Sequence, residues 1–391
     1  MSEAVFQWSP NARLNVAGRW LDEGDDAVTA LERDLADLRS AIRSGQEFTI
    51  GPTGIQIVVP GKRGYFRSLS SGTTGAAKSI RRSHTSWIAS FEVNRAFLGL
   101  GPSDRYGMLG MPAHSLTLYA ISEAAHLGAN LHCLGGLRPR RQAQLLADAA
   151  VTVLYATPTQ LRLICETQVL LPDLRHILCG GGRLPPGLRA RIAALCPHAV
   201  MREFYGAAET SFIAWGDGSG PENAVGRAYP GVELRIGSKG EIWVRSPYLF
   251  DGYAEGDSPD TKWSDGYVTV GEMGALDADG FLTVSGRQNR MVTIADQNVF
   301  PEDIESLLLS DPAITHCAVI PRPDPSRLVS LVAVIAGRSD PELRDQMLGV
   351  CREAFGPLAA PRQVIELADF PVTPSGKPDL REIARRLGID E

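Results

Sequence analysis

The sequence lacks several features that would each indicate a particular class of protein. Its six cysteines are dispersed and none lie in a Cys-x-x-Cys pair, so we expect neither a structural zinc site nor a disulfide framework. It has no excess of positive charge. The formal net charge is −6 over 391 residues, which gives no electrostatic basis for non-specific binding to nucleic acid.

Long apolar stretches are missing as well. No uninterrupted apolar run is long enough to span a bilayer, and the first residues lack the basic start and apolar segment of a secretory signal. These absences predict a cytoplasmic protein with no membrane partner and no nucleic-acid partner. Glycine and proline are plentiful, at 40 and 26 residues, which is typical of many tight loops between short elements.

The hydrophobic pattern predicts an α/β fold. From about residue 78 to 215, helical segments alternate with short apolar runs, such as 151–155 and 176–179, which is typical of a layered α/β domain. From about 225 to 285, short β segments separated by glycine predict a β-rich subdomain. We therefore expect a large N-terminal domain over residues 1–286 and a small α+β C-terminal domain over residues 287–391.

The segment 70–78, Ser-Ser-Gly-Thr-Thr-Gly-Ala-Ala-Lys, is the most informative part of the sequence. Gly72 and Gly75 allow positive φ, so that successive N–H groups can converge on an anion. Lys78 adds a compact positive charge. Four hydroxyl groups add neutral donors: Ser70, Ser71, Thr73 and Thr74. This combination predicts a site for a polyphosphate.

A Walker A loop is the alternative interpretation of this segment. In that motif a second glycine precedes the Lys-Ser pair, but Ala77 occupies its position here. The residues that follow, 80–84, do not have the pattern of a helix that continues from the loop. Both observations argue against a Walker-type nucleotidase.

The same loop resembles the phosphate loop of the adenylate-forming superfamily, [ST]-S-G-T-T-G-x-x-K. That superfamily includes acyl- and aryl-CoA synthetases, the adenylation domains of nonribosomal peptide synthetases, and luciferases. Further motifs of the superfamily follow in the expected order up to residue 381. The resemblance implies a large domain and a small, mobile C-terminal domain. Relatives usually have a longer stretch before the loop, so we expect an N-terminally shortened large domain.

The resemblance implies a nucleotide site assembled from separate motifs. The Gly-Gly-x-x-Leu segment after residue 179 would lie against adenine, where only small residues allow a close approach. Glu272 takes the place of an aspartate that accepts hydrogen bonds from the ribose, and Glu209 would hold Mg²⁺ at the phosphates. Beyond the loop, the implied ATP-binding residues are Gly181, Gly182, Arg183, Tyr205, Gly206, Glu272 and Arg287.

The resemblance also implies which residues act in catalysis. The segment 371–377, Pro-Val-Thr-Pro-Ser-Gly-Lys, is similar to a C-terminal loop whose lysine enters the active site. Lys377 is therefore the implied catalytic residue, together with Lys78 and Glu209. Asn289 falls at the hinge position, where the family usually has Asp or Lys.

The implied activity is activation of a carboxylic acid by ATP and Mg²⁺ to an acyl adenylate, with release of pyrophosphate. Transfer to a phosphopantetheine thiol, of CoA or of an acyl or aryl carrier protein, would complete the reaction. Such a reaction needs no protein nucleophile, because positioning and charge stabilisation supply the catalysis.

The expected acid pocket contains His114, Ser115 and Ala207. Amino-acid-activating members place an Asp near the first two, and the absence of an acid argues against a substrate with a buried ammonium group. The run 78–84 and the pair Ala208-Glu209 are similar to aryl-acid-activating enzymes. We therefore expect an aromatic acid, such as a hydroxybenzoate, with a medium-chain acyl substrate as the alternative.

Departures from the family pattern leave two other outcomes open. Asp296 stands where the family usually has a glycine beside the pantetheine arm, which suggests transfer to an amine instead of a thiol. The residues at Val270, Glu272 and Asn289 also differ from the pattern, which is compatible with a non-catalytic nucleotide-binding protein. An exposed edge of the large domain would allow a homodimer.

Overall fold

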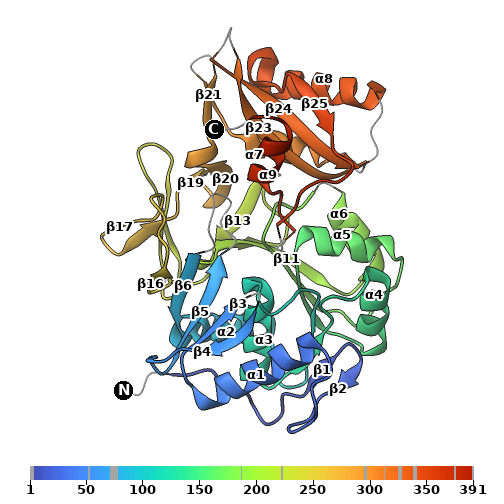
Figure 1. The fold of residues 1–391 in the computed structure, drawn as a ribbon, viewed down its shortest axis with the longest axis vertical. Coiled ribbons are helices and arrows are strands. Elements are labelled where there is room, and N and C mark those ends of the chain that lie inside the picture. Colours follow the sequence, from blue (N-terminus) through green and yellow to red (C-terminus); the bar gives the residue numbers. More distant parts are fainter. Residues whose placement is uncertain are drawn as a thin grey trace.

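The computed structural model consists of a large domain and a smaller domain, which is drawn in orange and red in Figure 1. The described residues are 4–51, 53–70, 78–185, 187–221, 223–294, 297–311, 313–324, 328–337, 341–373 and 376–389. The last strand of the large domain, β20 (Phe281–Arg287), ends one residue beyond the predicted boundary. A short 3₁₀ helix, η1 (Gln288–Arg290), follows it and leads into the smaller domain.

In the described part of the chain, the large domain is built on an 11-stranded sheet. Its strands lie in the order β19 (Glu272–Leu276), β20, β13 (Ala224–Ala228), β12 (Ser211–Gly216), β11 (Val200–Ala207), β10 (His176–Cys179), β9 (Val153–Ala156), β7 (Arg105–Met108), β8 (Asn130–Cys133), β1 (Leu14–Val16) and β2 (Arg19–Trp20). The run from β11 to β1 is parallel, and the strands beyond either end of it are antiparallel. Its middle strands are buried on both faces, as expected of a parallel sheet covered by helices.

Two smaller sheets complete the large domain. One contains β16 (Gly252–Glu255), β6 (Lys78–Ser83), β5 (Tyr65–Ser70), β3 (Phe48–Gly51) and β4 (Gly54–Ile57) in that order. The other contains β14 (Glu233–Ile236), β15 (Ile242–Arg245), β18 (Tyr267–Thr269) and β17 (Lys262–Ser264). It lies within the predicted β-rich segment, but β13, β19 and β20 of that segment belong to the main sheet.

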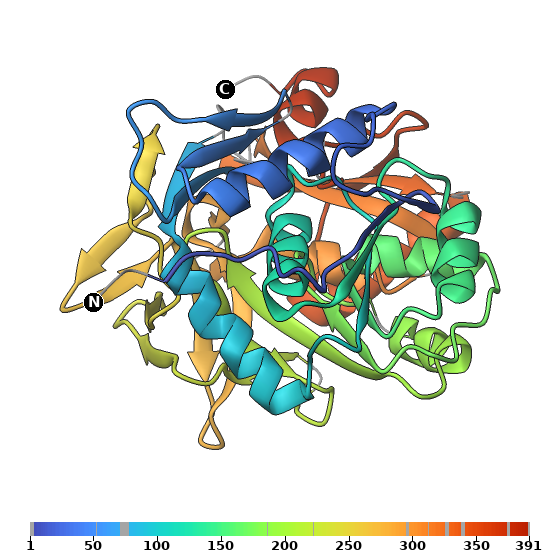
Figure 2. The same ribbon diagram turned by 90° about the horizontal axis from the view of Figure 1, so that it is seen from below.

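The helices of the large domain cover these sheets. They are α1 (Ala30–Ser44), α2 (His84–Leu98), α3 (Ser115–Leu127), α4 (Pro139–Asp148), α5 (Pro158–Glu166) and α6 (Leu188–Leu195). Thr29 and Glu32 form a reciprocal capping box at the start of α1, and Thr157 and Gln160 do the same for α5. Helix α3 contacts the main sheet and β5, so it is packed between two sheets (Figure 2).

The small domain has an α+β architecture with a hydrophobic core of its own. Its elements are β21 (Val292–Ile294), β22 (Gln297–Val299), α7 (Pro301–Leu308), β23 (Ile314–Asp324), β24 (Leu328–Gly337), α8 (Pro341–Ala359), β25 (Gln363–Glu366) and α9 (Leu380–Arg386). None of the helices in the described ranges has the length and apolar character that crossing a bilayer requires. All six cysteines are buried and unpaired.

A polar network lies in the core where α3 meets the main sheet. Glu123 of α3 is completely buried and accepts hydrogen bonds from Asn94 Nδ2 (2.8 Å), Tyr155 OH (2.7 Å) and Tyr106 OH (3.0 Å). Burial raises the pKa of Glu123 from 4.5 to about 7, although these hydrogen bonds oppose the shift. The folded protein therefore binds a proton at Glu123 more tightly than the unfolded chain does.

We expect Glu123 to make stability depend on pH. Because its pKa is raised on folding, its contribution to the free energy of unfolding is full below pH 4.5 and declines as the pH rises to about 7. Glu123→Gln should remove this component, whereas the exposed Glu342→Gln should keep it. Urea unfolding across this pH range measures the effect. Parallel pH profiles for wild type and Glu123→Gln would contradict the assignment.

Candidate functional site

The predicted phosphate loop joins two antiparallel strands. Ser70 ends β5, Lys78 begins β6, and these two residues are opposite each other in the strand pair. Between them, the predicted loop residues Ser71, Gly72, Thr73, Thr74 and Gly75 lie outside the described residues. Because β6 continues to Ser83 and α2 begins only at His84, a strand follows the loop and not the helix of a Walker A site.

Tyr253 connects Lys78 with Glu209. Strand β16 pairs with β6, and Lys78 Nζ lies 5.7 Å from the centre of the Tyr253 ring. The Tyr253 hydroxyl donates a hydrogen bond to Glu209 Oε1 at 2.9 Å. Burial raises the pKa of Tyr253, and the Glu209 carboxylate raises it further, so the phenol stays a neutral donor. Tyr253 is not predicted from the sequence, because nothing local indicates which strand lies beside β6.

Arg82 fixes the backbone turn that carries Glu209. Its side chain is buried, with 1% of the residue exposed, and Nη2 donates to the carbonyl of Ala208 at 2.6 Å. Nη1 donates to the carbonyl of Tyr248, and Phe250 N donates to the carbonyl of Glu209 at 2.8 Å. Burial lowers the pKa of Arg82 to about 10, which leaves it charged at neutral pH. The turn is thus held from both sides.

His84 also has a structural role. It is completely buried, its Nδ1 accepts a hydrogen bond from Phe6 N at 3.0 Å, and its ring stacks on Phe6. Burial lowers the pKa of His84 to about 3, so it is neutral. Arg82 and His84 belong to the run 78–84 that is similar to aryl-acid-activating enzymes. The contacts of these two residues are with the protein's own backbone and core.

A connected row of side chains lies beside the turn that carries Glu209. It consists of Tyr205, Glu272 and Arg287. The Tyr205 hydroxyl donates to Glu272 Oε2, and Glu272 Oε1 lies 3.7 Å from Arg287 Nη2. The row results from strand pairing, because Glu272 and Arg287 are opposite each other at the ends of β19 and β20. Burial and the neighbouring Glu272 raise the pKa of Tyr205. The predicted ribose ligand Glu272 is therefore close to Tyr205 and Arg287, which the resemblance also implies for ATP binding.

Lys377 of the small domain faces the same region. Thr373 N donates a hydrogen bond to the carbonyl of Lys377 at 2.8 Å. Lys377 retains solvent-exposed surface, yet the protein around it lowers its pKa by burial; Arg287 lowers it further, while Glu272 and Glu209 oppose the shift. The structure thus brings Lys377 into electrostatic range of three residues of the large domain.

The glycine run after β10 is constrained mainly at its first residue. A Cβ atom on Gly180 would lie 2.3 Å from the ring of Phe204, so the ring would have to shift to admit any larger residue. Gly181 has a φ of +86°, which side chains rarely adopt, whereas a Cβ on Gly182 would only touch Pro158 at 3.8 Å. Gly206 is also required, because a Cβ would lie 1.9 Å from the carbonyl oxygen of Ser211.

The next residue, Arg183, makes polar contacts with two other segments. Its Nη2 donates to Asn223 Oδ1 at 2.9 Å, and its Nη1 lies 3.8 Å from Asp303 Oδ1 of α7. The resemblance implies that Arg183 binds ATP, and this stays a prediction. In the structure its side chain contacts the large-domain loop at Asn223 and α7 of the small domain.

The predicted acid-pocket residues come from two elements. His114 and Ser115 lie at the N-terminus of α3, and Ala207 ends β11; all three are half-buried. Burial lowers the pKa of His114, so its imidazole is neutral at pH 7. His114 and Ser115 would line a pocket with a neutral imidazole and a hydroxyl group. Neither offers a carboxylate that could pair with the ammonium group of a substrate.

The predicted hinge residue is attached to the large domain. Asn289 Nδ2 donates to Asp260 Oδ2 at 2.9 Å, and the preceding Gln288 N donates to the carbonyl of Gly271 at 2.8 Å. Asp296 lies outside the described residues. The predicted hinge segment is therefore held to the large domain by hydrogen bonds just after β20 ends.

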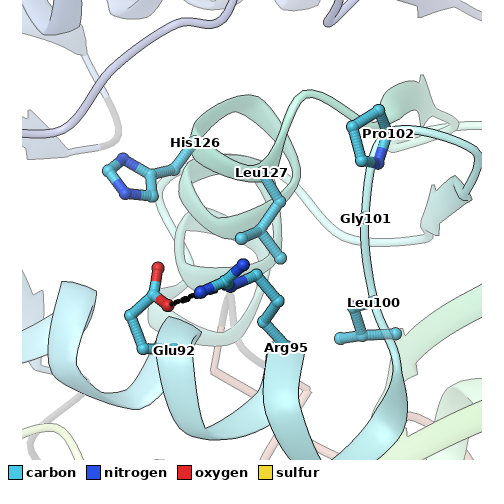
Figure 3. Close-up of a pocket in the computed structure, with 7 residues that line it drawn as sticks. All are labelled: Glu92, Arg95, Leu100, Gly101, Pro102, His126 and Leu127. Atoms are coloured by element: carbon cyan, nitrogen blue, oxygen red, sulfur yellow. Dashed lines mark hydrogen bonds and ion pairs between the residues drawn. The ribbon is translucent and has the colours of Figure 1, made fainter.

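A hollow of about 420 Å³ lies elsewhere, between the ends of α2 and α3 (Figure 3). It is lined by Glu92, Arg95, Leu100, Gly101, Pro102, His126 and Leu127. No predicted site residue is among them. This hollow is therefore separate from the candidate site.

The side chains at the site fit a metal that comes with the nucleotide. Among the described residues, no group of three or more His, Cys, Asp or Glu could hold a metal ion. Glu209 offers a single carboxylate, one oxygen of which already accepts from Tyr253. This matches Mg²⁺, which binds proteins through one or two carboxylates and takes its other ligands from phosphates and water.

Comparison with known families identifies the chain. Residues 62–254 match the model for AMP-binding enzymes, and residues 303–377 match the model for the C-terminal domain of AMP-binding enzymes. This chain belongs to the AMP-binding, adenylate-forming family. The first match contains the phosphate loop and Glu209, and the second ends at Lys377. Glu272, Arg287 and Asn289 lie between the two matched segments.

Relatives of known sequence cover most of the chain. An uncharacterised acyl-CoA ligase of Bacillus subtilis, YhfT, is 28% identical over 91% of this chain and 74% of its own length. The salicyl-AMP ligase/salicyl-S-ArCP synthetase of Mycobacterium tuberculosis is 29% identical over 82% of the chain and 61% of its own length. The chain thus spans less than two thirds of the second of these relatives.

Solved structures of this AMP-binding family share the fold. The amide bond synthetase McbA of Marinactinospora thermotolerans is 26% identical over 82% of this chain and 69% of its own, with a TM-score of 0.71. The o-succinylbenzoate CoA synthetase MenE of Bacillus subtilis is 22% identical, with a TM-score of 0.72 over 81% of this chain and 68% of its own. The predicted fold, a large α/β domain with a smaller C-terminal domain, is confirmed.

The glycine run provides a test of local packing. Gly180→Ala should reduce the free energy of unfolding by roughly 1–3 kcal/mol, because its methyl group would overlap the Phe204 ring. Gly182→Ala is the matched control, and it should change stability by less than about 0.5 kcal/mol because its methyl group has room. Chemical denaturation measures both values. Equal stability of the two variants would rule out the close packing at Gly180.

Proposed function

We propose that this protein activates a carboxylic acid with ATP to form an acyl adenylate, with release of pyrophosphate. One observation carries the proposal: Lys78, Glu209, Glu272, Arg287 and Lys377, which are far apart in the sequence, come together where the two domains meet. Both domains match the AMP-binding family, which supports the same reaction.

In this reaction the substrate carboxylate attacks the α-phosphate of ATP and pyrophosphate leaves. The Lys377 ammonium group offsets negative charge that develops on the α-phosphate oxygens. Lys78, at the end of the phosphate loop, holds the departing pyrophosphate. Glu272, together with Tyr205 and Arg287, forms the ribose end of the site, while the glycine run provides a flat surface for the adenine.

Glu209 is the residue that would hold Mg²⁺, and the ion would neutralise charge on the phosphates. Arg82 and Tyr253 keep the Glu209 carboxylate in place, through the carbonyl of Ala208 and through a direct hydrogen bond. A rigid carboxylate of this kind favours catalysis by positioning.

For the acid, we propose an aromatic carboxylate such as a hydroxybenzoate. Neutral His114 and Ser115, without a nearby acid in the motif, disfavour an α-amino acid. The relationship to a salicyl-AMP ligase supports an aryl acid. A medium-chain acyl substrate is the alternative, since other relatives are named as long-chain fatty acid–CoA ligases.

The proposed acceptor is a phosphopantetheine thiol, of CoA or of a carrier protein. The acyl-CoA ligase and the aryl-carrier synthetase among the relatives support a thiol. An amine is the second candidate acceptor, and the structural similarity to an amide bond synthetase favours it. A homodimer through the exposed edge strand β2 stays a prediction, which sedimentation at micromolar concentration would test.

Lys377 provides the direct test of the reaction. Lys377→Ala should reduce acid-dependent ATP–pyrophosphate exchange by about 100-fold or more, because the charge on the α-phosphate is no longer offset. ATP binding, measured by calorimetry, should be largely kept. Lys239→Ala, which removes an exposed lysine between β14 and β15 that is not among the predicted site residues, is the matched control. Full exchange in Lys377→Ala would show that another group has this role.

A substrate screen tests the acid and the acceptor separately. We expect exchange to be greatest with aryl acids, weaker with medium-chain acids and absent with α-amino acids, since the motif offers no partner for an ammonium group. Product analysis with CoA, holo-carrier protein and amines then identifies the acceptor. ATP binding without exchange across the whole panel would favour a non-catalytic protein.

A further inference from the structure

The side chain of Arg183 extends from the large domain to the small one. It follows the glycine run after β10, and its Nη2 is held by Asn223 Oδ1 at 2.9 Å, within the large domain. Its Nη1 lies 3.8 Å from Asp303 Oδ1, on the first turn of α7 in the small domain. One side of this guanidinium group is therefore anchored while the other crosses the domain boundary.

The first turn of α7 also contacts the hinge. Glu302, next to Asp303, accepts a hydrogen bond from Arg287 N at 3.3 Å and pairs with Arg290 at 3.2 Å. The contacts of Glu302 are therefore with residues at the hinge itself, whereas Asp303 is paired with a residue far from the hinge in sequence. A rotation of the small domain about residues 288–290 would separate Asp303 from Arg183.

We propose that Arg183 and Asp303 form an interdomain latch that holds the small domain where Lys377 faces Glu209 and Glu272. Both are then positioning residues for adenylate formation, and they act through Lys377. The catalytic part of this inference rests on the proposed function. The latch itself is a property of the domain arrangement.

The exposure of the pair suits a latch that opens. The Arg183 and Asp303 side chains are 35% and 37% exposed, so water screens their attraction. An ion pair of this kind shifts an equilibrium by about two- to fivefold. That is enough to change the balance between two domain arrangements, and too little to decide whether either domain folds.

Charge reversal and charge exchange test the latch. Asp303→Arg places two positive groups together. The double variant Arg183→Glu/Asp303→Arg restores an ion pair in which the two charges are exchanged between the positions. Arg95→Ala, which breaks the exposed Glu92–Arg95 pair within α2 (Figure 3), is the matched control. Acid-dependent pyrophosphate exchange is one readout.

The second readout does not depend on turnover. Spin labels at Lys239→Cys and Gly349→Cys report the distance between the domains by electron–electron double resonance. Both positions are exposed, and all six native cysteines are buried. We expect Asp303→Arg to shift or broaden the distance distribution and to reduce exchange two- to tenfold. The double variant should reverse most of both effects, and Arg95→Ala should cause neither.

The outcomes separate the latch from the proposed reaction. If Asp303→Arg leaves the distance distribution unchanged, the latch is wrong, although exchange can still support the reaction. If the double variant loses exchange as completely as Arg183→Glu alone, Arg183 acts on the nucleotide and the latch is overturned. If wild type shows no exchange but the distances shift and recover as expected, the latch stands while the proposed reaction fails.

Discussion

The candidate site depends on strand β6. Residues on one face of this strand contact the site, and residues on the other face contact different parts of the large domain. Alternate residues of a strand point to opposite faces. On one face, Lys78 lies beside Tyr253, Ile80 packs with Phe250 and Val268, and Arg82 holds the turn before Glu209. On the other face, Arg81 pairs with the buried Glu47. A shift of one residue in strand register would exchange these faces and dismantle the site.

Burial of Arg82 explains how a loop can hold a carboxylate in a defined position. Removing a guanidinium group from water is costly unless its donors are satisfied. The carbonyls of Ala208 and Tyr248 accept from Arg82, so the charge is compensated only when the turn at residues 208–209 is in place. Side-chain burial and backbone geometry are thereby coupled. The network at Glu123 similarly ties α3 to the main sheet.

The small domain reaches the site through polar contacts. Arg183 with Asp303, and Asn289 with Asp260, link the domains through side chains that remain accessible to water. Such contacts can be exchanged for water at little cost, unlike the packed core within each domain. Under the proposed latch, Lys377 of the small domain can therefore approach the large-domain carboxylates and leave them again.

The sequence alone determined much about this protein, because local patterns carry local structure. Hydrophobic spacing predicted the layered α/β domain, the β-rich segment and the α+β domain, and the apolar run 176–179 agrees with β10 in both bounds. The spacing of glycine, hydroxyl and lysine residues indicated Lys78, and the resemblance to the adenylate-forming superfamily indicated Glu209 and Lys377. Tertiary structure alone decided the partners of these residues. These partners are Tyr253, the buried contacts of Arg82 and His84, and the contact of Arg183 with Asp303. They depend on strand pairing and domain packing. Both bring together residues that are far apart in the sequence, and the sequence itself does not indicate that they are close in space.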